Sequence, residues 1–132
     1  MPAVSLVATL VATILGFLLG ALWYGPLFGK RWMTEVGLTS DGIKRDFNPV
    51  RTYGSTFVCG LIASYVFGLY LGPQPGLAFS VITGAAAGIC LVATSLATNY
   101  LFEGRRAPLI VINGSYHAVR FILIGLSFGL LG

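Results

Sequence analysis

Charged residues are scarce in this chain, and their scarcity excludes most classes of protein. Only 9% of its 132 residues are charged, whereas 56% are hydrophobic and the mean hydropathy is +0.87. A soluble domain averages about 25% charged and about 45–50% apolar residues. The composition therefore excludes a soluble globular domain, a disordered chain and a disulfide-stapled secreted module. It indicates an integral membrane protein with a single domain, residues 1–132.

The sequence also lacks motifs for catalysis or for nucleic-acid binding. It has no phosphate-binding loop, no nucleophile motif and no paired carboxylates. Cys59 and Cys90 lie in apolar runs at depths similar to that of His117, but no metal-binding spacing connects the three. The net charge of +4 comes mainly from two loops beside apolar segments. We therefore expect no enzymatic activity, no nucleic-acid partner, no cofactor and no metal.

Four apolar runs are long enough to cross about 30 Å of hydrocarbon as helices. They cover residues 3–22, 53–71, 77–100 and 109–131 and contain a single charge, Arg120. Helices satisfy every backbone amide in lipid. The predicted fold class is all-α, a four-helix transmembrane bundle with residues 23–52 as its main loop. In that loop, Thr39 or Ser40 can cap a short helix that ends near Phe47.

Basic residues lie on one side of the predicted bundle. The turn 72–76 and both termini have no Lys or Arg, whereas the loops 23–52 and 101–108 carry seven: Lys30, Arg31, Lys44, Arg45, Arg51, Arg105 and Arg106. The positive-inside rule predicts that both loops are cytoplasmic and both termini outside. Trp23, Tyr24, Trp32, Tyr53, Tyr70, Tyr100 and Phe102 flank the spans, as in an interfacial aromatic belt.

Small and polar residues gather on one face of each predicted helix. Small residues at four-residue spacing allow close helix packing, and the predicted packing positions are Gly16, Gly20, Gly60, Ser64, Gly84, Gly88, Gly125 and Gly129. On the second helix Tyr53 and Thr56 extend this face, and on the third Ser95, Thr98 and Asn99 do so. The last helix has a separate small-residue face, Gly114, Ala118, Gly125 and Gly129, which could meet a second copy or another subunit.

An intramembrane polar cluster is predicted on the last helix, where Asn113, His117 and Arg120 share a face with Tyr116. Arg120 lies near the midplane, and no span contains an acid. Arg120 therefore either snorkels toward the outer headgroups or pairs with a partner subunit, a lipid phosphate or an anionic ligand. His117 either makes a structural hydrogen bond to Thr94, Ser95 or Thr98, or belongs to a functional site.

Two segments resemble signatures of a known family. Residues 20–33 read GALWYGPLFGKRWM, with Trp23, Tyr24, Pro26, Lys30 and Trp32; residues 101–105 read LFEGR, with Glu103 and Arg105, and INGSYH follows at 112–117. Together they resemble the bacterial four-helix membrane family known as domain of unknown function 1761. The resemblance implies a fold and a bacterial inner-membrane location but no activity. It marks Asn113, Tyr116 and His117 as typical of the family, and Arg120 as outside its pattern.

Two functions remain open at this point. The first is a non-enzymatic subunit or scaffold of a membrane complex or homo-oligomer, which rests on the separate glycine face and on the unpaired Arg120. The alternative is a small-solute or ion transporter or channel, with Asn113, His117 and Arg120 along its path. Glu103 with Arg105 and Arg106 is a lipid-binding or catalytic cluster or a solvated turn, and Glu103 could also pair with Lys30 or Arg31.

Overall fold

The chain folds into helices joined by turns, as described by a computed structural model that covers residues 4–39, 42 and 48–132. Four helical spans are long and apolar enough to cross a membrane: Leu6–Leu27, Pro49–Leu71, Leu77–Phe102 and Ala107–Leu131. The predicted fold class, an all-α polytopic membrane protein, is confirmed.

Two of the spans contain a π-helical turn. The first of the four spans consists of α1 (Leu6–Leu22) and the π-turn η1 (Trp23–Leu27), and it leads into α2 (Gly29–Val36). The second span is the continuous helix α4 (Pro49–Leu71). The third consists of α5 (Leu77–Ala87), the π-turn η2 (Gly88–Ala93) and α6 (Thr94–Phe102), and the fourth is α7 (Ala107–Leu131).

The main loop is shorter than residues 23–52, because helices occupy both of its ends. α4 begins four residues before the predicted start at Tyr53, since Oδ1 of Asn48 accepts a hydrogen bond from the Arg51 N–H at 3.1 Å and Pro49 takes the first helical position. At the other end, η1 and α2 extend the first helix to Val36. The predicted short helix lies outside the described residues, except for Thr39 and Gly42.

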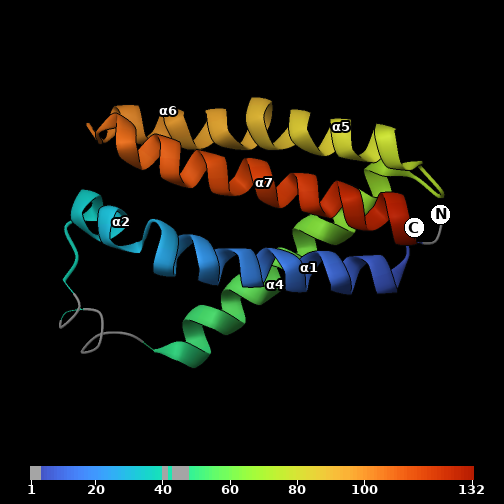
Figure 1. Cartoon of the computed structure of the whole chain (residues 1–132), viewed down its shortest axis with the longest axis horizontal. Helices are drawn as coiled ribbons and strands as arrows, with labels where there is room; N and C mark the ends of the chain where they lie inside the picture. Colours follow the sequence, from blue (N-terminus) through green and yellow to red (C-terminus); the bar gives the residue numbers. More distant parts are fainter. Residues whose placement is uncertain (1–3, 40–41, 43–47) are drawn as a thin grey trace.

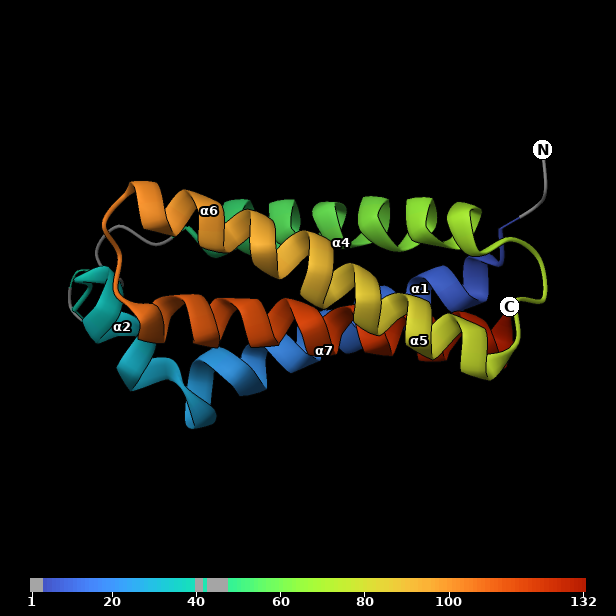
Figure 2. The same ribbon diagram turned by 90° about the horizontal axis from the view of Figure 1, so that it is seen from above.

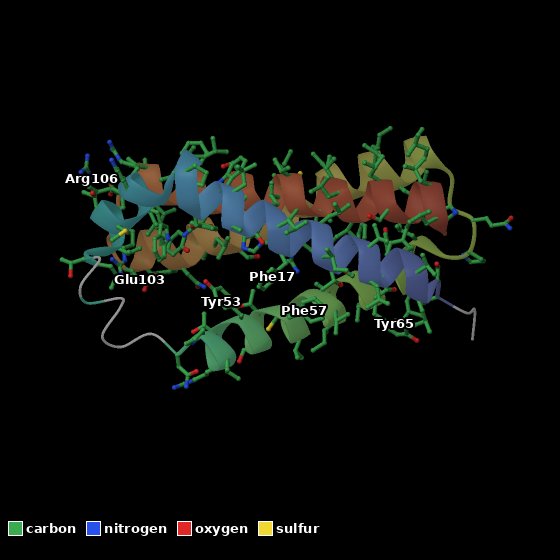
Figure 3. The ribbon with its side chains drawn as sticks, turned by 60° about the horizontal axis from the view of Figure 1, so that its bottom comes forward. Phe17, Tyr53, Phe57, Tyr65, Glu103 and Arg106 are labelled. Atoms are coloured by element: carbon green, nitrogen blue, oxygen red, sulfur yellow. The ribbon has the colours of Figure 1, made fainter. Side chains whose placement is uncertain are left out.

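Helix α7 is the central element of the bundle (Figure 1). The α5–η2–α6 span packs along one side of α7 and crosses it obliquely when seen from above (Figure 2), while α1 packs along another side. α4 crosses α1 at a steep angle, and ring contacts join Phe17 of α1 to Tyr53 and Phe57 of α4, with centroids 5.7 and 6.2 Å apart (Figure 3).

The two ends of the bundle differ in their contents. The start of α1, the end of α7 and the α4–α5 turn lie at one end, which we call the terminal end (Figure 1). α2 and the α6–α7 turn lie at the opposite end, which we call the basic end because it holds Arg31, Arg105 and Arg106. The apolar core belongs to the terminal half: Ala8, Ala12, Phe67, Leu71, Ile124 and Phe128.

The small-residue face of α7 is buried inside the bundle. A Cβ added to Gly88 would lie 2.8 Å from Cα of Ala118, and one added to Gly129 would lie 2.9 Å from Cα of Leu77. Gly125 packs in the same way on the Ser80 carbonyl. The expectation that this face is free to meet another subunit is therefore wrong, because α5 and η2 of the same chain cover it.

On the third helix, the residues predicted to face inward are buried only as far as Gly88. Gly84 and Gly88 are buried against α7, whereas Ser95, Thr98 and Asn99 are exposed. A π-helical turn holds one more residue than an α-helical turn, so η2 rotates the following residues by about 100° from their α-helical positions. On the second helix, Gly60 and Ser64 are buried, but Tyr53 and Thr56 are exposed because that part of α4 diverges from the bundle (Figure 1).

Candidate functional site

The π-turn η1 follows directly from the Gly-Pro-x-x-Gly sequence at residues 25–29. Pro26 has no N–H and cannot bond the carbonyl four residues earlier. The chain instead forms a wider turn, in which the Phe28 N–H donates to the Trp23 carbonyl at 2.9 Å. Gly29 fits this turn because a Cβ there would lie 2.5 Å from the Tyr24 carbonyl oxygen. The first family-like segment thus encodes a specific break in the helix.

This turn directs two aromatic side chains toward α7. Nε1 of Trp23 donates a hydrogen bond to the Ile112 carbonyl at 2.9 Å, and Oη of Tyr24 donates to Oδ1 of Asn113 at 2.5 Å. Nδ2 of Asn113 in turn donates to Oη of Tyr100 on α6 at 2.8 Å. Asn113 therefore links three spans. Trp23, Tyr24 and Tyr100, predicted as parts of an interfacial belt, are also partners in the contact with α7.

The next turn of α7 joins the same network. Oη of Tyr116 donates to the Gly16 carbonyl at 3.0 Å and lies 3.3 Å from where a Cβ on Gly20 would be. Its ring packs edge-on against Tyr24, with centroids 5.3 Å apart. Gly16 and Gly20 thus make room on α1 for polar side chains of α7, rather than for direct contact between two backbones.

Arg120 extends into the bundle between α1, α4 and α7. Its Cγ and Nε lie 3.4 and 3.5 Å from the Cβ position of Gly16, and its Nη2 lies 3.9 Å from that of Gly60. Its guanidinium carbon is 5.6 Å from the centroid of the Phe121 ring, a cation–π distance. Arg120 lies about 20 Å along α7 from Ala107, near the middle of the helix. The side chain thus extends toward α1, α4 and His117.

His117 contacts Arg120 rather than the hydroxyls of α6. Nη1 of Arg120 lies 3.4 Å from Nδ1 of His117. A guanidinium can only donate, so Nδ1 accepts, and the proton of the neutral ring is on Nε2. The expected partners Thr94, Ser95 and Thr98 bond backbone carbonyls of their own helical span, because η2 has turned them outward. Both side chains, Arg120 and His117, thus offer N–H donors to a ligand.

The polar groups form a line from the basic end to the middle of the bundle. It runs from the Asn113 network through Tyr116 and the His117–Arg120 pair to Thr13 and Ser64, whose hydroxyl oxygens are 3.4 Å apart. Beyond Ser64 lies the apolar core of the terminal half, including Phe67 and Phe128. The network that links the spans through side-chain hydrogen bonds thus lies in the basic half, and the apolar core lies in the terminal half.

Sequence reasoning missed one acid at the basic end. Glu35 of α2 has a side chain that is only 4% exposed, and its Oε1 lies 3.2 Å from Nε of Arg31 and 3.6 Å from Nη1 of Arg106. The ion pair expected between Glu103 and Arg31 is thus replaced by an i, i+4 pair within α2. The signal was present, because Arg31 and Glu35 have helical spacing in a segment predicted as loop.

The remaining signature residues lie around this network. The ring of Trp32 packs edge-on against Tyr24, with centroids 5.5 Å apart, whereas Lys30, Glu103 and Arg105 are exposed at the basic end. Cys59 and Cys90 are also exposed. Within residues 4–39, 42 and 48–132, no three His, Cys, Asp or Glu side chains are placed to hold a metal ion.

The two family-like segments therefore meet at one place in the fold, through Tyr24 and Asn113. Residues 7–129 match the sequence profile of a family described as a protein of unknown function, DUF1761. The match spans nearly the whole chain, so the chain belongs to this family, and the resemblance seen in the sequence is confirmed. No curated protein and no solved structure matches the chain.

Proposed function

For this member of the DUF1761 family, we propose a non-enzymatic role: binding a small monovalent anion inside the bundle and moving it across the membrane. The observation that carries the proposal is the interior position of Arg120. All four acids of the chain, Glu35, Asp41, Asp46 and Glu103, lie outside the spans. Charged groups within membrane spans pair with one another or with backbone carbonyls, or face a water-filled cavity, and a mobile anion would give Arg120 the opposite charge that these acids do not supply.

The surroundings of Arg120 favour a small ligand. Gly16 and Gly60 provide the room that the side chains of Arg120 and Thr13 occupy, since a Cβ at Gly16 would lie 3.4 Å from Cγ of Arg120 and one at Gly60 would lie 3.2 Å from Cγ2 of Thr13, so little room remains for a large ligand. The Arg120 guanidinium and Nε2–H of His117 are all donors, which suits a carboxylate or a halide. The polar line from Asn113 to Arg120 supports access from the basic end, and the apolar core beyond Ser64 supports a barrier on the other side.

The experiment compares anion uptake for wild type, Arg120→Leu and Arg120→Lys. Purified protein in liposomes is tested with iodide and acetate as probes. We expect uptake by wild type, strongly reduced uptake by Arg120→Leu because the cation is lost, and partial uptake by Arg120→Lys because the charge remains. Arg51→Leu, which removes an exposed arginine at the start of α4, is the matched control and should behave as wild type.

A binding measurement keeps the test valid if the leucine variant folds poorly. A ligand that binds the folded state raises its melting temperature. Acetate or iodide should therefore raise the melting temperature of wild type in detergent at constant ionic strength, relative to a bulky anion such as gluconate. No anion-dependent shift in wild type, or unchanged uptake by a folded Arg120→Leu protein, would contradict the proposal.

Assembly into a homo-oligomer or a larger membrane complex is the second candidate function. It is favoured by the exposed polar residues Thr98 and Asn99 of α6 and by the exposed Thr56 of α4, which lie within predicted spans. In this case uptake by wild type stays at the background of empty liposomes, and Asn99→Leu, on the exposed face of α6, lowers the native mass of the solubilised protein. The uptake by wild type and the masses of wild type and Asn99→Leu after mild solubilisation therefore separate the two candidates.

We further propose that the basic end faces the cytoplasm and that both termini lie outside, in a bacterial inner membrane. Six basic residues outside the spans, together with Arg51 in the first turn of α4, support this orientation. The anion would then enter the polar line from the cytoplasmic side.

A further inference from the structure

A pocket at the basic end contains groups of both charges. It has a volume of about 540 Å³ and lies between the end of α2 and the α6–α7 turn; its lining residues are Thr34, Glu35, Glu103, Gly104, Arg105 and Arg106. Figure 3 shows Glu103 and Arg106 at this turn, beyond the last turns of the spans. Because the third span ends at Phe102 and the fourth begins at Ala107, the pocket lies at the depth of lipid headgroups.

Glu35 is the acid of the pocket that is not satisfied by the protein. Although Oε1 has two arginine nitrogens within ion-pair distance, it accepts no hydrogen bond from the described residues. A buried carboxylate oxygen without a donor is unfavourable. A ligand with N–H donors would supply the hydrogen bond that the two guanidinium groups do not give. An ammonium group has three such donors.

The same pocket offers donors for a phosphate. Arg106 has a side chain that is 73% exposed, so most of its five N–H donors are available, and Arg105 is exposed beside it. Arg106 is also the N-cap of the 25-residue helix α7, but this helix end adds few donors, because Pro108 has no N–H and the Leu109 N–H donates to the Arg106 carbonyl at 3.2 Å. The two arginines therefore favour a phosphate near Arg106.

From these groups we propose that the pocket binds a phosphoethanolamine headgroup, with its phosphate at Arg105 and Arg106 and its primary ammonium at Glu35 and Glu103. A phosphatidylethanolamine lipid is the form that the position favours, because Leu101 and Phe102, which are 68% and 91% exposed, lie directly beside the turn for contact with acyl chains. Phosphatidylcholine has the same charges, but its trimethylammonium group has no N–H to give to Glu35.

The experiment measures binding of individual lipids to the full-length protein in detergent by native mass spectrometry. Phosphatidylethanolamine, its N,N-dimethyl derivative, phosphatidylcholine and phosphatidylglycerol are compared. We expect affinity to fall along the methylated series, by about tenfold from phosphatidylethanolamine to phosphatidylcholine, since a charge-assisted hydrogen bond to Glu35 is lost. Equal affinity of wild type for all four lipids would overturn the proposal, whether or not any variant folds.

Variants assign the preference to the pocket. Glu35→Gln should remove the preference for the primary ammonium, and Arg106→Gln should weaken binding of all four lipids; Arg51→Gln, away from the pocket, is the matched control. A folded Glu35→Gln protein that keeps the full preference would contradict the assignment. The second arm of the experiment adds free phosphoethanolamine as a competitor. If it displaces the lipid, the pocket recognises the headgroup alone. If it does not displace the lipid and the preference for phosphatidylethanolamine remains, the intact lipid is the ligand.

Discussion

Ser80 of α5 is a buried hydroxyl without a hydrogen-bond partner among the described residues. It is 0% exposed and packs against Gly125 of α7. Leaving such a group unsatisfied costs about 1–3 kcal/mol. We therefore expect Ser80→Ala to raise the melting temperature in detergent, by an amount that corresponds to about 1 kcal/mol.

Ser127→Ala is the matched control for this substitution. Ser127 is equally enclosed, but its Oγ donates to the Leu123 carbonyl at 2.8 Å. Removing that bond should leave stability unchanged or lower it. A lower melting temperature for Ser80→Ala than for Ser127→Ala would mean that the Ser80 hydroxyl makes a stabilising bond in the membrane.

Single residues differed in how well their roles could be predicted. Asn113, Tyr116 and His117 were identified as a polar cluster; in the structure Asn113 and Tyr116 make hydrogen bonds to the first and third spans, and His117 contacts Arg120. The partners of Asn113 could not be predicted, because Tyr24 and Tyr100 are equally typical of an interfacial belt. Glu35 was missed because its burial depends on α2 folding back toward Arg106, a tertiary contact.

At the scale of elements, the contact between η2 and α7 depends on the absence of a side chain at Gly88. A Cβ there would lie 2.8 Å from Cα of Ala118 and 2.9 Å from the His117 carbonyl oxygen, and backbone atoms cannot move aside as side chains can. Gly88→Leu should destabilise the bundle by more than the ~1–3 kcal/mol typical of overpacking, and thermal melts in detergent measure the loss.

The neighbouring position supplies the control. Ile89 is 53% exposed on the same π-turn, so Ile89→Leu should leave the melting temperature nearly unchanged. If Gly88→Leu melts like Ile89→Leu, helix α7 does not pack on η2 as described here.

The four spans could be predicted because their length and apolarity are properties of the local sequence. The two π-turns could not be predicted in this way, because the helix faces were assigned with a constant rotation of about 100° per residue, which assumes an uninterrupted α-helix. At η1 the sequence does contain a cause, Pro26 followed by Gly29. At η2 the residues GICLVA include no proline, and we find no local reason for the turn in the sequence. The predicted inward face of α6 was therefore wrong, whereas the predicted inward faces of α1 and α5 were close to the buried faces of these helices.

At the scale of the whole molecule, the Tyr24–Asn113 hydrogen-bond network and the apolar core lie in different halves of the bundle, although the buried hydroxyls of Ser80 and Ser127 also lie in the terminal half. The apolar core surrounds Phe67, Ile124 and Phe128 in the terminal half, and the hydrogen-bond network of Tyr24 and Asn113 lies in the basic half. A face-by-face analysis of single helices does not reveal this division, because it appears only when the halves of all spans are assembled. It favours access to Arg120 from one side.

The charge asymmetry of the two ends leads to a prediction of topology. Arg105 and Arg106 lie at the same end as α2, whereas the turn 72–76 at the terminal end has no Lys or Arg. A reporter fused at Gly132 should therefore be active only outside the cytoplasm, and one fused after Val36 only inside. If the reporter at Gly132 is found in the cytoplasm, the protein has the opposite orientation to the one proposed. The pocket of Glu35 would then meet the outer leaflet, and an anion bound at Arg120 would enter from outside the cell.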